Sequence, residues 1–114
     1  EYKSDMLKGA PPDILNKYFD FNGNFRVKSF VGKKTQFKFH DLVLDEPLTG
    51  MDMIICRNVA IYFERPLQEK IFRDFHDSLN ERGCLFLGKA ETPIGPMQEK
   101  FRTIDKHWRI YEKI

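Results

Sequence analysis

The sequence predicts an α/β fold in which a sheet is covered by helices. Two short apolar segments, Met51–Arg57 and Cys84–Leu87, flank a stretch with helical periodicity over Pro66–Asn80. In the first segment Ile54 and Ile55 are adjacent instead of alternating with polar residues, which predicts a strand that is buried on both faces. We therefore expect Met51–Arg57 to be a central strand with helices on both sides of its sheet.

The first forty residues predict a helix and then a small antiparallel hairpin. Prolines open the segment Pro11–Phe19, where a missing N–H costs nothing, and its apolar residues share one helical face. The pair Asn22-Gly23 signals a turn. Alternation after Phe25, and again over Gln36–Leu42, predicts strands on either side of a second turn. We expect this β subdomain to cover about residues 21–39.

The remaining residues, about 40–114, predict the later strands and helices of the sheet. Asp45–Gly50 reads as a polar loop, and Pro66–Asn80 carries apolar residues every three to four positions up to a stop at Gly83. The two segments 97–104 and 107–114 predict an antiparallel pair, or a short helix before a last strand. The chain of 114 residues is long enough for one domain.

Composition excludes several classes of protein. The chain is 41% hydrophobic and 32% charged, and its net charge of +2 is too small to indicate a polyanion partner. No apolar run approaches the roughly 18 residues of a membrane span, so we expect no membrane insertion. Cys56 and Cys84 have neither Cys-x-x-Cys nor histidine spacing, which indicates reduced, buried thiols in a cytoplasmic protein and no metal site.

Two polar residues follow the predicted central strand directly. Arg57 and Asn58 stand at its carboxyl end, which is where ligands bind in open α/β sheets. Their chemistry suits a polar crevice for a small molecule. The alternative is that Asn58 caps the next helix and Arg57 forms a surface ion pair.

Three strings resemble one known family. DMIICRNVAIYF over residues 52–63, RGCLFLGKAET over 82–92 and FRTIDKHWRIYEK over 101–113 are similar to the C-terminal half of the CheR-type chemotaxis receptor methyltransferases. The departures are Lys89 and Ala90, where that family usually has His-Ser before the glutamate matched by Glu91. The resemblance implies the C-terminal part of a Rossmann-like methyltransferase fold that is S-adenosylmethionine-dependent, with a small antiparallel β hairpin subdomain.

The resemblance also implies an activity and roles for individual residues. The family transfers a methyl group from S-adenosylmethionine to glutamates of methyl-accepting chemotaxis receptors. Arg57 and Asn58 would then line the cofactor pocket, with Arg57 and Tyr62 close to methyl transfer and Tyr62 orienting the incoming carboxylate. An ionised glutamate is already a nucleophile, so the enzyme supplies mainly proximity and alignment. From chemistry alone, Tyr62 reads as a core aromatic beside Phe63.

The pair Asp41-Leu42 would hold the adenine. In the family, an asparagine after such a strand accepts a hydrogen bond from the adenine amino group, and the next backbone N–H bonds a ring nitrogen. Asp41 keeps the required acceptor, and Leu42 supplies the N–H. The alternative for Asp41 is an Asx turn at the end of a strand.

The stretch from residue 21 to residue 40 is basic and contains no acidic residue. Its cations are Arg26, Lys28, Lys33, Lys34 and Lys38. Such a run is commonly a solvated face, but it also suits an acidic peptide, an edge-strand partner or nucleic acid. In the family a β subdomain here docks receptor tails, so we expect a receptor partner and no nucleic acid. The alternative function is a non-catalytic protein-binding module on the same scaffold.

One half of a cofactor site is missing from these residues. No Gly-x-Gly loop opens a βαβ unit, and no acidic residue follows about 20 positions later to bind ribose hydroxyls. In the family both features lie upstream of residue 1, so we expect a fragment that is inactive alone. The absent strands would leave the Met51–Arg57 edge open, which predicts non-native pairing with Gln36–Leu42 or a homodimer through that edge.

Overall fold

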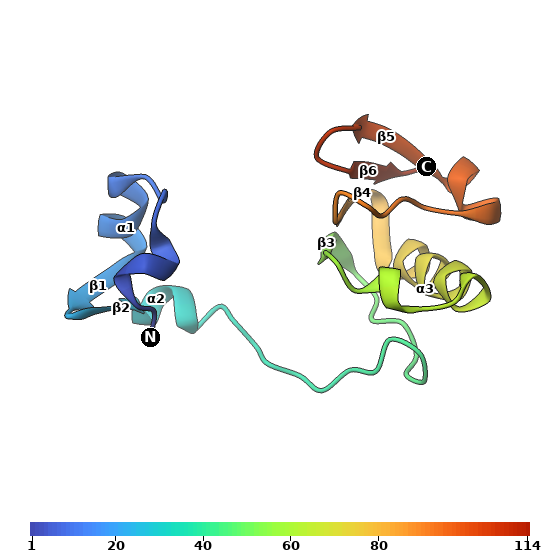
Figure 1. Ribbon diagram of the computed structural model, residues 1–114. Coiled ribbons are helices and arrows are strands. Elements are labelled where there is room, and N and C mark those ends of the chain that lie inside the picture. The colour runs from blue at the N-terminus through green and yellow to red at the C-terminus, as the bar shows by residue number, and fades with distance from the viewer. The chain divides into compact units, whose positions relative to one another are not determined.

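The computed structural model describes all 114 residues, which form two units, Glu1–Phe39 and His40–Ile114. The elements of the first unit are two short helices, a 3₁₀ turn and a hairpin (Figure 1). Their bounds are η1 Ser4–Leu7, α1 Pro12–Tyr18, β1 Phe19–Asn22, β2 Asn24–Val27 and α2 Ser29–Gly32.

The hairpin of the first unit turns at Gly23. Its φ of +77° lies in the left-handed region, which glycine adopts without steric cost, and it pairs β1 with β2 in antiparallel register. Tyr2 adds a bridge to Phe25 through two backbone hydrogen bonds of 2.6 and 2.7 Å. The rings of Phe21 and Phe25 lie 4.9 Å apart between centroids. No residue of this unit is fully buried, so it has aromatic contacts but no closed core.

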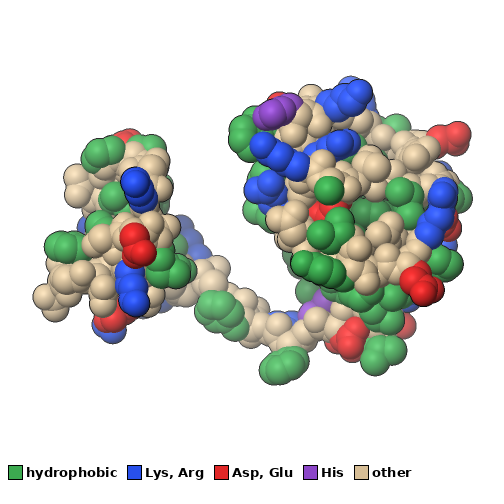
Figure 2. All heavy atoms as spheres, in the orientation of Figure 1, with side chains coloured by type: hydrophobic (Ala, Val, Ile, Leu, Met, Phe, Trp, Pro, Cys, Tyr) green, Lys and Arg blue, Asp and Glu red, His purple; other side chains and the backbone are tan.

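The strand predicted over Gln36–Leu42 does not form. These residues have no regular structure, and the hairpin instead joins β1 to β2, ahead of a single helical turn, α2. Phe37 and Phe39 are almost completely exposed, as Figure 2 shows for hydrophobic side chains along this segment. Alternation predicts a strand only where a neighbour accepts its hydrogen bonds, and none pairs here. Non-native pairing of this segment with the Met51–Arg57 strand is likewise not seen.

The second unit contains a four-stranded sheet and one long helix (Figure 1). Its elements are β3 Met51–Cys56, η2 Ala60–Tyr62, α3 Arg65–Ser78, β4 Leu79–Leu87, η3 Gly95–Lys100, β5 Phe101–Asp105 and β6 Ile110–Lys113. The strand order is β3-β4-β6-β5; β3 and β4 are parallel, and the other two pairs are antiparallel. The predicted helix and the predicted C-terminal strand pair are confirmed, as is the mixed α/β fold class with a small antiparallel hairpin.

The core lies between α3 and one face of this sheet. Ile71 and Phe72 of α3 are 1% exposed, and Leu85 and Leu87 of β4 are 0% exposed. Spacing of three to four residues brings the apolar side chains of α3 onto one face. The helix begins at Arg65, has Pro66 in its first turn, and ends at Ser78, before the extended residue Leu79. No helix of the structure is both long and apolar enough to cross a membrane.

The prediction that the Met51–Arg57 strand is central and buried on both faces is wrong. Ile54 packs against the core, but Ile55 is 63% exposed, and β3 is an edge strand, not a central one. The reason is that β3 pairs with β4 alone and α3 covers only the Ile54 face. Cys56 and Cys84 are free cysteines, and both are half-buried where the sequence predicted buried thiols.

Candidate functional site

The loop after β3 presents the polar pair at the carboxyl end of a parallel strand. Arg57 donates from Nε to the carbonyl oxygen of Leu87 at 3.2 Å. Its guanidinium carbon also lies 4.9 Å from the centroid of the Phe86 ring. Asn58 has a φ of +60°, a left-handed conformation that asparagine tolerates better than most residues. The terminal guanidinium nitrogens of Arg57 make no hydrogen bond within the chain and remain available.

The carboxylate of Glu91 binds the backbone of this loop. Its carboxylate is 4% exposed and accepts the backbone N–H groups of Asn58 at 2.7 Å, Val59 at 3.2 Å and Ala60 at 2.8 Å. A fourth N–H, from Gly88, reaches it at 2.7 Å. Burial, and then the charge of Glu91, raise the pKa of the Cys56 thiol at the end of β3. The role of Glu91 was not predicted from the sequence, where its one signal is an acidic residue just after the apolar strand and its glycine.

The capping alternative for Asn58 is contradicted. The N-cap positions of η2 and α3 are Val59 and Glu64, and neither makes a side-chain capping hydrogen bond. The side chain of Asn58 is therefore not used to start a helix. A second anchor of the loop comes from α3, because Gln68 donates to the carbonyl oxygen of Ala60 at 2.7 Å.

Tyr62 is not a core residue. Its side chain is 81% exposed, whereas the neighbouring Phe63 is half-buried and packs against the core. The pattern Ile-Tyr-Phe therefore points one aromatic ring into the protein and leaves the other in solvent. This removes the interpretation of Tyr62 as a packing residue and leaves its hydroxyl free for a ligand.

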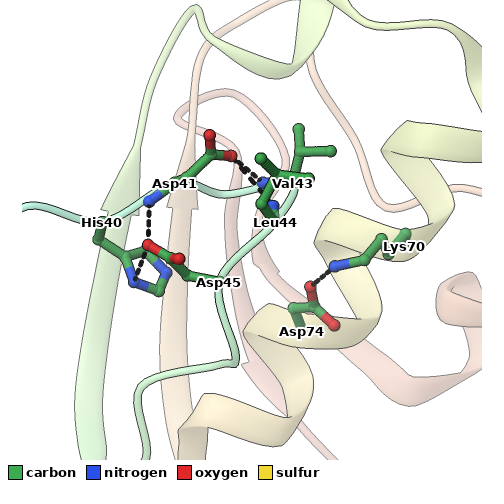
Figure 3. A network of polar contacts seen from close by, with 7 residues as sticks. All are labelled: His40, Asp41, Val43, Leu44, Asp45, Lys70 and Asp74. Carbon is green, nitrogen blue, oxygen red and sulfur yellow. Dashed lines mark hydrogen bonds and ion pairs between the residues drawn. The ribbon is translucent and has the colours of Figure 1, made fainter.

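Asp41 forms the predicted Asx-type turn, shown in Figure 3. Its Oδ1 accepts the N–H groups of Val43 at 2.8 Å and Leu44 at 3.0 Å, and its own N–H donates to Oδ2 of Asp45 at 2.7 Å. The hydrogen bond from Val43, and then that from Leu44, hold the pKa of the Asp41 carboxyl below its ordinary value. The carboxylate is thus ionised and fixed in orientation.

The turn leaves an acceptor and a donor uncommitted. Oδ2 of Asp41 and the backbone N–H of Leu42 make no hydrogen bond within the chain. An adjacent acceptor and donor match the amino group and ring nitrogen on the edge of an adenine. The residues present therefore fit the adenosine end of S-adenosylmethionine, while the Asx turn serves to orient the carboxylate.

The structure does not bring all the predicted site residues into one place. The side chain of Leu42 lines an apolar cavity of about 240 Å³ with Met51 and Ile54 of β3 and with Phe75 and Ser78 of α3. Arg57 and Asn58 follow the carboxyl end of β3, and Tyr62 is the last residue of η2. No hydrogen bond or ion pair joins Asp41 to that loop.

The basic stretch of the first unit is exposed. Arg26 pairs with Glu1 at 3.3 Å, and both side chains are largely in solvent. Lys33 and Lys34 follow α2 and form no ion pair within the chain. They are free to meet an acidic partner.

Comparisons with known proteins show which family the chain resembles. The family profile described as "CheR methyltransferase, SAM binding domain" matches residues 1–110. A chemotaxis protein methyltransferase of Listeria innocua is 36% identical over 111 residues, which cover 96% of this chain and 42% of that protein. A putative methyltransferase, Cher3, of Pseudomonas putida is 32% identical over 115 residues, which cover 99% of this chain and 42% of that protein.

A third relative is much longer. It is an uncharacterized 104.1 kDa protein of Rhodobacter capsulatus, 30% identical over 114 residues that make up 12% of its length. The chain thus spans less than half the length of these relatives. The profile match covers nearly the whole chain, and S-adenosylmethionine is the cofactor that the profile's description names. The chain belongs to the CheR family of methyltransferase SAM-binding domains.

Proposed function

We propose that the protein of which these residues are part is a protein-glutamate O-methyltransferase that modifies methyl-accepting chemotaxis receptors in the cytoplasm. The observation that carries this proposal is the ordered Arg57–Ala60 loop at the carboxyl end of a parallel strand, in a member of the CheR family. Its curated relatives include chemotaxis protein methyltransferases.

The chemistry requires alignment more than acid–base help. S-adenosylmethionine supplies a methyl group on a sulfonium. A carboxylate oxygen of the substrate glutamate forms the new C–O bond as the S–CH₃ bond breaks, so the products are a methyl ester and S-adenosylhomocysteine. No proton moves, because the glutamate is ionised near neutral pH. The enzyme therefore contributes orientation of the two reactants.

The proposed site residues divide this task. Asp41 and the N–H of Leu42 would bind the adenine edge through the free acceptor and donor described above. Arg57 and Asn58 would line the pocket near the methionine portion, and the free guanidinium nitrogens of Arg57 suit a carboxylate. The exposed hydroxyl of Tyr62 would orient the substrate glutamate. These assignments are supported by the uncommitted polar groups of each residue.

The two groups of residues must act on one cofactor. Asp41 and Leu42 lie in the irregular segment 40–50, whose hydrogen bonds are made within its own turn, while Leu42 packs against the core. Arg57 is held firmly by β4. We therefore propose that segment 40–50 adjusts when the adenosine binds, while the Arg57–Ala60 loop keeps its conformation.

The test is transfer of a labelled methyl group by the full-length protein to the cytoplasmic fragment of a chemoreceptor. The expected product is an ester, which mild alkali releases as volatile methanol. A receptor fragment whose methylated glutamates are replaced by alanine is the matched control. Binding of the receptor without any alkali-labile label would favour the alternative, a non-catalytic protein-binding module.

A further inference from the structure

We propose that Glu91 is a positioning residue, which fixes the Arg57–Ala60 loop in the conformation that presents Arg57 and Asn58 to cofactor and substrate. The proposal rests on the function proposed above and adds a residue that does not itself touch the reactants. Glu91 comes from the turn after β4, whereas the loop follows β3. The interaction therefore joins two segments more than thirty positions apart in the sequence.

The four hydrogen bonds divide evenly between the two carboxylate oxygens. Oε1 accepts from Asn58 and Gly88, both at 2.7 Å. Oε2 accepts from Val59 at 3.2 Å and Ala60 at 2.8 Å. Hydrogen bonds to an ionised acceptor are roughly twice as strong as neutral ones. A glutamine amide at this position could accept from one pair of donors only, and its NH₂ group would face the other pair of N–H donors.

The three successive N–H groups of Asn58, Val59 and Ala60 form a concave anion-binding nest. Such a nest would ordinarily be available to an anionic ligand. Here Glu91 occupies it, and its carboxylate is almost completely buried. We infer that the backbone of this loop does not bind the carboxylate of the cofactor, and that the side chains of Arg57 and Asn58 make the contacts with the ligand.

Glu91 is itself held in place by a tight turn. Its N–H donates to the carbonyl oxygen of Gly88 at 2.9 Å, while its side chain turns back to the N–H of Gly88. A Cβ at position 88 would lie 2.3 Å from Oδ1 of Asn58 and 2.6 Å from Oε1 of Glu91. Only glycine leaves room for the carboxylate and the loop together.

The neighbouring contact of Arg57 strengthens this coupling. Arg57 donates to the carbonyl oxygen of Leu87, the residue before Gly88. Residues 57–60 therefore donate one side-chain and three backbone hydrogen bonds to residues 87–91. Loss of the carboxylate would free Asn58 from its left-handed conformation and move the base of the Arg57 side chain. Displacements of about 1 Å are enough to lower a catalytic rate about a hundredfold.

Glu112 provides a matched control on the same sheet. It is also a buried carboxylate, 7% exposed, but its partners are the side chains of Arg82 and Arg102. It makes no contact with the Arg57–Ala60 loop. A glutamine at either position removes one buried charge, so the two variants share a loss of stability and differ in their effect on the loop.

The experiment compares Glu91→Gln with Glu112→Gln in the full-length protein. At a temperature where both are folded, we expect kcat to fall about 10- to 100-fold in Glu91→Gln and to remain near wild type in Glu112→Gln. Amide hydrogen exchange by NMR should show at least two of the four bonded amides losing protection in Glu91→Gln alone. Gly88→Ala should likewise lower kcat and reduce the protection of these amides, because its Cβ would displace the Glu91 carboxylate.

Two results would overturn the proposal. One is a folded Glu91→Gln variant with wild-type kcat and wild-type exchange at these amides. The other needs no variant: Asn58 and Val59 are exposed residues whose amides have Glu91 as their only acceptor, so their rapid exchange in the wild type would exclude the clamp. If the wild type transfers no methyl group, the proposed function fails, and the exchange measurement still decides the role of Glu91.

Discussion

The guanidinium of Arg57 lies across the ring of Phe86, with 4.9 Å between the guanidinium carbon and the ring centroid. In the sheet, Phe86 of β4 pairs with Ile55, and the pairing of β3 with β4 ends at Cys56. Arg57 therefore contacts β4 from one residue beyond the paired part of β3. The ring and the carbonyl oxygen of Leu87 together fix the plane of the guanidinium. Lysine has no plane to fix, and would not reproduce this arrangement.

Replacement of the loop side chains should reduce turnover more than stability. Arg57→Ala and Tyr62→Phe remove exposed groups, so we expect each to change the free energy of unfolding by less than about 1 kcal/mol. We expect kcat to fall at least about tenfold, because both groups would align the reactants. Kinetics and thermal unfolding of the two variants test this, with Arg65→Ala, an exposed arginine on α3, as the control. Unchanged kinetics in both variants would contradict the assignment of Arg57 and Tyr62 to the site.

Both side-chain oxygens of Asp41 should contribute to cofactor binding. Asp41→Ala removes the free oxygen and the acceptor of the Val43 and Leu44 bonds, so we expect the dissociation constant for S-adenosylmethionine to rise about tenfold. Asp41→Asn has a single oxygen to serve both the turn and the adenine, so its affinity should lie between those of the alanine variant and the wild type. Calorimetric titration of the full-length protein distinguishes them. Equal affinity of the alanine variant and the wild type would contradict the adenine assignment.

Glu112 should make stability depend on pH in the acid range. The hydrogen bond from Arg102, and then that from Arg82, hold the pKa of Glu112 below its ordinary value of 4.5. A lowered pKa in the folded state stabilises the protein fully above about pH 4.5, and this contribution is lost as the pH falls through the folded pKa. Glu112→Gln should therefore lower the Tm at neutral pH and flatten its fall between about pH 5 and pH 3. Glu99→Gln, at an exposed position, should leave the pH dependence of the Tm unchanged.

The sequence predicted those elements whose periodicity and partners lie within the same segment. The amphipathic pattern of α3 and the turn at Gly23 needed only local information, and both were located correctly. The strand predicted over Gln36–Leu42 failed because alternation cannot report whether a neighbouring strand is present. For the same reason, adjacent Ile54 and Ile55 predicted burial on both faces, although only one face of β3 is covered.

The polar side chains of the candidate site could be predicted from the sequence, but the contacts that hold its loop in place could not. The string Cys-Arg-Asn-Val pointed to Arg57 and Asn58, since polar residues after a buried strand suggest a ligand site. The clamp by Glu91 depends on the Gly88–Glu91 turn after β4, which brings the carboxylate to the loop after β3, and no spacing in the sequence encodes that contact. Exposure of Tyr62 likewise follows from the turn geometry of η2.

The basic stretch of the first unit should contact the receptor and not the cofactor. Replacing both Lys33 and Lys34 with Glu reverses an exposed charge in the unit that holds none of the proposed cofactor residues. We expect the KM for the receptor to rise while the dissociation constant for S-adenosylmethionine stays unchanged. The double variant Lys100→Glu with Lys106→Glu makes the same change of charge in the second unit and serves as the control. Equal loss in both double variants would indicate a general charge effect, and loss of nucleic-acid binding would favour a different partner.

The open edge of β3 should make the 114-residue chain self-associate. β3 pairs only with β4, and its exposed Met53 and Ile55 lie beside unpaired backbone groups, which recruit other strands. The outer strand at the other edge, β5, carries Arg102 and Asp105, and charges there discourage pairing. We expect sedimentation to show dimers at high concentration, and Ile55→Lys to shift the chain toward monomer. Ile14→Lys places the same charge on α1 and should not change the association; a wild-type chain that stays monomeric throughout would contradict the prediction.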